Sequence, residues 1–321
     1  MTRADTLSGQ LDMFAEALRI SALGSSTLLR GLADDVRSGG EVGNMLTGHP
    51  SADQPLFGLR AVAGLHLLMM EGLVPDLEAA MVHATSVPES PSRLAELWPL
   101  ARHAMLRHGN HIAEALDRPV QQHEPHRTAA LLDGLCMLGV PRVRLLELGA
   151  CAGVGLLVDR YRWSGASGVW GPPESPLLLP AGPRARPHAF TIVERAGCDL
   201  APRNPRDPGD IRVLRSFIPP EHGSELRTLD AALRLAADTG VRVEQAAAGD
   251  WLRRRLAVPT ADPDVCTVVW HSLLWLYLDR DEQRAVERAI EEFAGRGSIA
   301  HIAYEPAEWG RPVRLSVTAY S

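Results

Sequence analysis

Apolar residues in the first part of the chain recur at the spacing of an α-helix, with polar residues between them. One such stripe consists of Leu11, Phe14, Ala15, Leu18 and Ala22. The same spacing predicts further helices near 26–37, 56–70, 76–84, 91–108 and 124–138. Glycine and proline separate these segments, and strand-like runs are absent. The pattern therefore predicts an all-helical region over residues 1–139.

The pattern changes at Pro141, where short apolar runs begin to alternate with amphipathic segments. Strands are predicted at 142–148, 190–194, 241–243, 265–271 and 298–304. Helices are predicted at 211–217, 224–237 and 281–294, and a stretch rich in proline and glycine at 162–189 predicts an inserted hairpin or loop. Because alternating strands and helices are typical of parallel sheets covered on both faces, we expect an α/β domain over residues 140–321.

A glycine-containing segment directly follows the first predicted strand and leads into a helix. It comprises Glu147, Gly149, Ala150, Cys151 and Gly153. Glycines allow a tight turn and a close approach of the backbone to a ligand, and a helix start offers free N–H groups. Because an acid precedes the first glycine, the segment resembles the first motif of class I methyltransferases. In those enzymes this motif holds the amino-acid and ribose portions of S-adenosylmethionine. The alternative is a junction that binds no ligand.

A second acid follows the strand at 241–243. Asp250 resembles the acid that meets the adenine amino group in that superfamily, and Trp251 beside it provides a ring for stacking. An acid that binds ribose is expected about 20 residues past the glycines. The insertion occupies that region, so we assign this role to Glu194 or Asp199, with a preference for Asp199.

Composition excludes several classes of protein. All 33 basic residues are arginine, so a phosphate-loop nucleotidase or a pyridoxal-phosphate enzyme, which need a lysine, is excluded. The net charge of -6 argues against nucleic-acid binding. The four cysteines form no C-x-x-C pair, so neither a metal site nor a disulfide framework is predicted. Without an apolar leader or a long apolar segment, the protein is expected in the cytoplasm, away from the membrane.

Four stretches together resemble a large uncharacterised bacterial family. They are 145–161 (LLELGACAGVGLLVDRY), 120–127 (VQQHEPHR), 197–202 (GCDLAP) and 249–250. Members of this family pair a helical N-terminal region with a class I methyltransferase-like Rossmann sheet, and the resemblance implies that fold here. The present chain differs from the family at Cys151, at Gly155 and at Gln122-His123, where serine, asparagine and Thr-Asn are usual. Family members also continue about 20 residues beyond Ser321, which predicts a shortened last hairpin. The nocardicin-pathway 3-amino-3-carboxypropyl transferase is similar to this family.

Several side chains are candidates for binding and catalysis. Glu124 and Pro125 suit a helix start, and Arg127 one turn later is placed to pair with the carboxylate of the cofactor. His123 and Glu124 are candidates to contact the acceptor or remove its proton, and His271, at the end of a predicted strand, is a further candidate base. A capped, solvent-facing helix start and a histidine that only supports its neighbours are the structural alternatives.

The combined pattern predicts an S-adenosylmethionine-dependent transferase that acts on a small-molecule acceptor, with the helical region as a lid over the substrate. Transfer of the 3-amino-3-carboxypropyl arm, or its cyclisation, is an alternative on the same fold. A protein that binds the nucleoside or serves as a scaffold without catalysis is another. A nicotinamide-dependent oxidoreductase is disfavoured because only one dinucleotide-binding half is recognisable.

Overall fold

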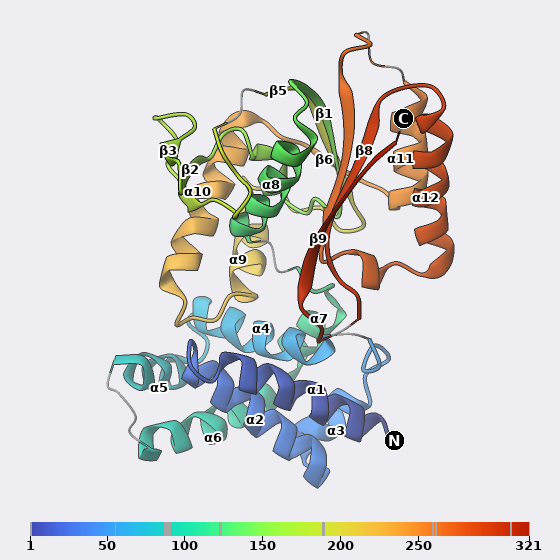
Figure 1. Cartoon of the computed structure of the whole chain (residues 1–321). Helices are drawn as coiled ribbons and strands as arrows, with labels where there is room; N and C mark the ends of the chain where they lie inside the picture. The colour runs from blue at the N-terminus through green and yellow to red at the C-terminus, as the bar shows by residue number, and fades with distance from the viewer. Residues whose placement is uncertain are drawn as a thin grey trace. The chain divides into compact units, whose positions relative to one another are not determined.

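The computed structural model describes residues 2–54, 56–86, 91–121, 124–187, 190–258, 260, 262–308 and 310–320. The chain divides into two compact units, each built from two stretches of sequence. The first, here called the helical unit, comprises Met1–Gln122 and Pro208–Arg227. The second, the sheet unit, comprises His123–Asp207 and Thr228–Ser321. Both units can be followed in Figure 1.

The helical unit is built from helices that bury one apolar stripe each. They are α1 (Arg3–Leu18), α2 (Leu23–Ser38), α3 (Glu41–Thr47), α4 (Phe57–Met70), α5 (Pro75–Ser86), α6 (Pro91–Arg107), α7 (Gly109–Asp117) and α9 (Pro208–Ser216). The predicted helices of this region are confirmed, and α3 and α7 are additional. The shared core includes Leu11, Leu29, Leu32, Phe57 and Leu97, all fully buried.

The returning segment 208–227 belongs to the helical unit through specific contacts. Val213 and Phe217 pack on Ala63 of α4, and the Nδ1 atom of His66 lies 3.2 Å from the carbonyl oxygen of Ser216. Glu221 accepts hydrogen bonds from the backbone N–H and the hydroxyl of Ser25, both at 2.7 Å. Because free N–H groups at a helix start need acceptors, Glu221 acts as a cap for α2.

The sheet unit contains a six-stranded, mostly parallel sheet with the order β6-β5-β1-β7-β8-β9. The strands are β1 (Arg142–Leu148), β5 (Thr191–Asp199), β6 (Val243–Gln245), β7 (Cys266–Ser272), β8 (Ile299–Pro306) and β9 (Val313–Tyr320). Only β9 runs antiparallel, paired with β8 as a hairpin. The predicted α/β fold with a parallel sheet is confirmed.

Helices cover both faces of this sheet, as Figure 1 shows. On one face lie α11 (Ala248–Ala257) and α12 (Arg280–Ala294), which share a core with β1, β7 and β8. On the other face α8 (Thr128–Leu138) packs on β8 and β9. Helix α10 (Gly223–Thr239) crosses the division between the units at residues 227 and 228. The central strands β1 and β7 are almost wholly buried because both faces of the sheet are covered there.

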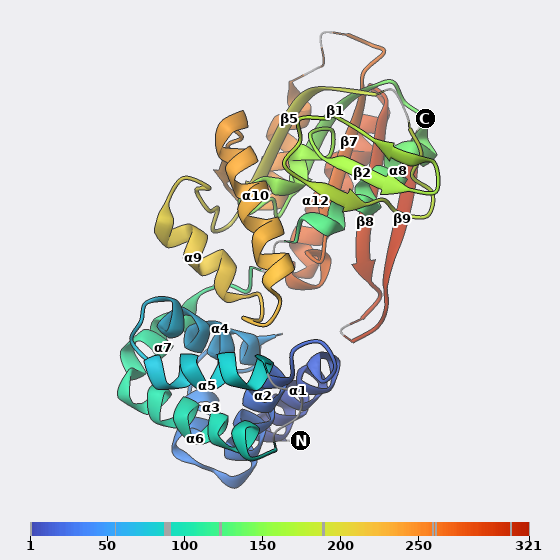
Figure 2. The same ribbon diagram turned by 90° about the vertical axis from the view of Figure 1, so that its left-hand side faces the viewer.

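The predicted insertion forms a small sheet of its own with the order β3-β2-β4. Its strands are β2 (Arg162–Gly165), β3 (Gly168–Trp170) and β4 (Leu178–Pro180), and Figure 2 shows them on the side of α8. The chain after β4 is attached to α8, because the carboxyl group of Asp133 accepts the backbone N–H of Arg184 at 3.1 Å.

The structural division differs from a simple boundary at residue 139. Residues 124–138, which form a short 3₁₀ helix η1 (Pro125–Arg127) and then α8, belong to the sheet unit because α8 packs on the strands. Among the described residues no single helix is long and apolar enough to cross a membrane. Only α4 and α5 taken together pass that test, and they are bent by 102° at the break between them.

Candidate functional site

The candidate site lies at the carboxyl ends of the parallel strands, where the strand order reverses direction. From β1 the chain moves outward to β5 and β6 on one side, and then to β7 and β8 on the other. In open α/β sheets, ligands bind in the crevice outside the strand ends at such a switch point. The glycine-containing loop after β1 is located there.

The backbone of this loop turns through three residues with positive φ. Gly149 has φ 71°, Cys151 49° and Gly153 76°, so the turn uses glycine at two of its three left-handed positions. The loop is held by the protein itself, because the N–H of Ala150 donates to the carbonyl oxygen of Cys198 at 2.9 Å. The loop is therefore preformed, and the ends of β1 and β5 support it.

Asp199 lies beside the loop, at the end of β5. One of its carboxyl oxygens accepts the N–H of Cys151 at 3.0 Å, and the other accepts the N–H of Ala201 at 2.8 Å. Burial raises the pKa of Asp199. Glu194, the other candidate for a ribose acid, lies inside β5 and pairs with Arg144 and Arg255. The structure thus places Asp199 at the site and Glu194 away from it.

Glu147 lies under the loop and is buried. Its Oε1 atom accepts a hydrogen bond from Nε1 of Trp270 at 3.2 Å, whereas its Oε2 atom has no partner among the described residues. The chain passes so close that a Cβ atom on Gly155 would collide with Oε1. Burial raises the pKa of Glu147 well above its ordinary value.

The predicted adenine-binding pair separates in the structure. Both residues lie in the first turn of α11, but Asp250 is exposed and forms an ion pair with Arg253 at 2.7 Å. Trp251 is fully buried in the core between the sheet and α12. The prediction that Trp251 stacks on a ligand is wrong, because its ring faces the interior while its neighbour faces solvent.

The segment before α8 lies next to the glycine loop. The helix η1 contacts η2 (Val154–Leu157), the 3₁₀ turn that ends the loop. Arg127, mostly buried in η1, lies 3.6 Å from the carboxyl group of Glu124. The structure therefore brings Glu124 and Arg127 to the neighbourhood of the loop, and Arg127 is engaged with Glu124. His123, the other predicted catalytic residue of this segment, lies outside the described residues.

His271 is buried at the end of β7, with both ring nitrogens engaged. Its Nδ1 atom lies 2.7 Å from Oε1 of Glu305, and its Nε2 atom 2.8 Å from Nε2 of His301. The ring also stacks on Trp275 with a centroid distance of 5.1 Å. Burial, with His271 as a smaller cause, lowers the pKa of His301 to about 3. His271 is 1% exposed, so an acceptor does not reach it in this arrangement.

Several residues at this edge were not identified from the sequence. Leu200, next to Asp199, is exposed by 69% and presents an apolar surface at the strand end. Leu274 lies against the glycine loop, where a Cβ atom on Gly149 would be 3.0 Å from its Cδ1 atom. His301 joins His271 and Glu305, the glutamate that the sequence already placed at the carboxyl end of its strand. The available signal for this cluster was the spacing of His301 and Glu305. They lie four positions apart in one strand, so their side chains share one face.

Two other features of the described residues are relevant to binding. No group of three or more histidine, cysteine, aspartate or glutamate side chains in that part of the chain is arranged to hold a metal ion.

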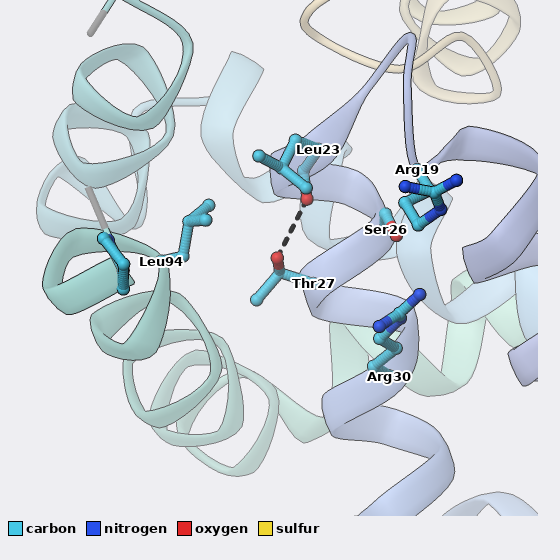
Figure 3. A pocket seen from close by; sticks show the side chains of 7 residues that line it. Arg19, Leu23, Ser26, Thr27, Arg30 and Leu94 are labelled. Atoms are coloured by element: carbon cyan, nitrogen blue, oxygen red, sulfur yellow. Dashed lines mark hydrogen bonds between the residues drawn. The ribbon is translucent and has the colours of Figure 1, made fainter. Parts of the chain in front are cut away.

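In the helical unit a groove of about 350 Å³ is shown in Figure 3. It is lined by Arg19, Leu23, Ser26, Thr27, Arg30, Pro91 and Leu94. Both arginines pair with the same carboxyl group, that of Glu16, which offsets one of their two positive charges.

The fold and the site define an open α/β protein with a preformed glycine loop at the switch point of its sheet. Residues 10–320 match the model of a family described as "Uncharacterized protein conserved in bacteria (DUF2332)". Because this match spans nearly the whole chain, the protein belongs to the DUF2332 family, and the bacterial family predicted from the sequence is confirmed. No curated protein and no solved structure matches the chain.

Proposed function

We propose that the protein binds S-adenosylmethionine at the carboxyl edge of its sheet and transfers an alkyl group from it to a small-molecule acceptor. The observation that carries the proposal is the position of Asp199, at the end of the strand next to the glycine loop. An acid at this place in an open α/β sheet binds ribose hydroxyl groups. Each carboxyl oxygen of Asp199 accepts one backbone N–H and retains a second lone pair for a hydroxyl donor.

The surrounding residues fit a nucleoside with an amino-acid arm. Leu200 offers an exposed apolar surface beside Asp199, where an adenine ring can lie. Gly149 brings the backbone close to the ligand without a Cβ atom, and Glu147 holds a buried oxygen without a partner under the same loop. Asp250, exposed at the start of α11, remains the predicted partner of the adenine amino group.

The chemistry of a sulfonium donor requires little covalent help from the protein. Its carbon is already activated by the positive sulfur, so the contribution of the chain is to align donor and acceptor. A preformed loop is suited to this task, because its geometry is set before the ligand arrives. Glu124, beside the loop, remains the predicted group that takes a proton from the acceptor.

The test is a calorimetric titration of the purified protein with S-adenosylmethionine and with S-adenosylhomocysteine. We expect micromolar binding, weakened at least about tenfold by Asp199→Asn, which preserves the shape and one acceptor oxygen but removes the charge. Asp250→Ala should also weaken binding. The matched control is Asp264→Ala, since Asp264 is exposed just before β7, at the opposite edge of the sheet.

Absence of binding by the folded wild-type protein would overturn the proposal and favour a scaffold or a different ligand. If binding is found, the released nucleoside identifies the group that is transferred. S-adenosylhomocysteine marks methyl transfer, and methylthioadenosine marks transfer or cyclisation of the 3-amino-3-carboxypropyl arm.

A further inference from the structure

The turn between β7 and α12 is attached to the end of β8 in part through one carboxyl oxygen. The backbone N–H of Leu274 donates to Oε1 of Glu305 at 2.8 Å. The same oxygen accepts the Nδ1–H of His271 at 2.7 Å. Glu305 therefore links the end of β7, the end of β8 and the first residues of the turn.

This turn passes directly over the glycine loop. The side chain of Leu274 lies so close to Gly149 that a Cβ atom there would be 3.0 Å from Cδ1 and 3.3 Å from Cδ2 of the leucine. The preceding residue, Leu273, has a φ of 51°, which is unfavourable for a branched side chain. Its N–H donates to the carbonyl oxygen of Tyr304 at 3.1 Å. The surrounding contacts must therefore maintain the position of the turn.

His271 supports the turn from below. Its ring stacks on Trp275 with an interplanar angle of 16°. The hydrogen bond from Nδ1 to Glu305 leaves Nε2 as the acceptor of the Nε2–H of His301, so the ring is held on two sides. A histidine with both nitrogens occupied is suited to orient its neighbours, and less suited to take a proton from an acceptor.

We propose that Glu305 is a positioning residue that holds Leu274 as a wall of the donor site, with His271 acting through Glu305 and Trp275. This inference rests on the proposed binding of S-adenosylmethionine and assigns Leu274 to the side of the glycine loop that faces β7. The donor's non-polar carbons adjoin this wall, since leucine offers no polar group. The role replaces the one expected for His271 as a base.

The inference is tested with Glu305→Ala, Glu305→Gln and Leu274→Ala. Glu305→Ala removes the acceptor for Leu274, whereas glutamine keeps an oxygen in its place. The matched control is Gln283→Ala, which acts on the end of the same turn that is nearer to α12. The Nε2 atom of Gln283 donates hydrogen bonds to the carbonyl oxygens of Trp275 (2.8 Å) and Leu278 (3.3 Å). Two quantities are measured for each variant: hydrogen exchange at the Leu274 amide by NMR, and affinity for S-adenosylhomocysteine by calorimetry.

We expect Glu305→Ala to accelerate exchange at Leu274 and to weaken binding, each by about tenfold or more. Glu305→Gln should restore most of both, and Gln283→Ala should change neither by more than about threefold. Leu274→Ala tests the wall directly without disturbing Glu305, and it should also weaken binding by about tenfold.

Equal binding by the wild type, Glu305→Ala and Leu274→Ala would overturn this inference and leave the proposed function intact. An effect of Gln283→Ala as large as that of Glu305→Ala would also overturn it, because any loosening of the turn would then suffice. No binding by the wild type would overturn both proposals, whatever the exchange rates.

Discussion

A buried acid with one hydrogen bond is the most unusual single residue of the site. Glu147 is 4% exposed, its Oε2 atom has no partner among the described residues, and burial raises its pKa well above the ordinary value. Since the folded state holds the proton more tightly than the unfolded state, ionisation of Glu147 opposes folding as the pH rises above about 4.3. Burial therefore favours the protonated, uncharged form of this carboxyl group in the folded protein.

Replacement of Glu147 by its neutral isostere tests this expectation. Glu147→Gln should leave the free energy of unfolding at pH 7 unchanged or raise it, because no buried charge is lost. Glu147→Ala should lower it by roughly 1–3 kcal/mol, since Nε1 of Trp270 then lacks its acceptor. Urea unfolding at pH 7 measures both values. A large loss of stability in Glu147→Gln would show that the carboxyl group is ionised and paired.

At the scale of single residues, the sequence predicted the position of the glycine loop well and the position of the Trp251 ring poorly. Glu147, Gly149 and Asp199 could be placed because strand ends and glycines are readable from local pattern. Trp251 could not, because Asp250 and Trp251 are adjacent in sequence and only the helix phase of α11 decides which side chain is buried. Leu274 lies in the turn after β7 and Glu305 lies in β8, so their meeting depends on the order of β7 and β8 in the sheet.

At the scale of elements, the start of α2 depends on a residue far away in sequence. Glu221 accepts both donors of Ser25, and a Cβ atom on Gly24 would lie 2.8 Å from its Oε1 atom. Glu221→Ala should lower the free energy of unfolding by about 1–2 kcal/mol, because the α2 start loses its cap. Thermal or urea unfolding checks this. The control is Glu96→Ala, since Glu96 is an exposed glutamate of α6. This variant should change the free energy of unfolding by less than about 0.5 kcal/mol.

The segment that follows the inserted small sheet is attached to α8 in part by the buried side chain of Asp133. The carboxyl group of Asp133 accepts the N–H of Arg184, and Gly182 passes so close that a Cβ atom would meet the carboxyl group. Asp133→Ala should therefore release this segment and accelerate trypsin cleavage after Arg184 at least about tenfold. Asp133→Asn, which keeps an acceptor oxygen for this N–H, should be cleaved more slowly than Asp133→Ala. Equal cleavage of all three proteins would contradict this attachment.

Predicted elements match the structure where periodicity was sustained over several turns or a whole strand. Strand β5 extends to Asp199, beyond the predicted 190–194. The prediction stopped too early because Arg195 interrupts the apolar run. In the structure the strand continues through Arg195, and its guanidinium group pairs with Asp159. Helix α11 was not among the predicted helices, because only its first residues, Asp250 and Trp251, were interpreted. The short α3 lies among glycines, and its existence depends on Asp35, which accepts the N–H of Gly43 at 2.7 Å.

At the scale of the whole molecule, acidification acts on buried histidines. Burial lowers the pKa of His66 to about 4, with Arg215 as a further cause. Its folded pKa lies below the unfolded value near 6.5, so this contribution to stability is complete above that value and is lost as the pH falls toward 4. His301, with a pKa of about 3, acts in the same direction.

His66→Asn tests the contribution of His66, because the asparagine amide can replace the Nδ1–H donor to Ser216 without titrating. The wild type should lose about 2 kcal/mol more than the variant between pH 7 and pH 5. Guanidinium unfolding followed by circular dichroism at the two pH values gives the difference. Parallel losses in both proteins would contradict the assignment.

The division of the chain was the hardest property to predict from sequence. The change of pattern at Pro141 is real, but α8 precedes it and packs on the sheet, and 208–227 follows it and packs with helices. Helix α9 carries the same amphipathic pattern as any helix of an α/β domain. Its location depends on partners such as Ala63 and His66, more than 140 positions earlier.

The interleaved arrangement of the two units has a consequence for synthesis on the ribosome. When the nascent chain has emerged as far as residue 122, the helices of the first unit still lack α9 and the carboxyl group of Glu221. Those arrive only after β1 and β5 have been translated, so the helical unit cannot be completed before part of the sheet unit has emerged. For as long as residues 123–207 are being made, Ala63 therefore lacks its apolar partners in and directly after α9, and Ser25 lacks the acceptor that caps α2.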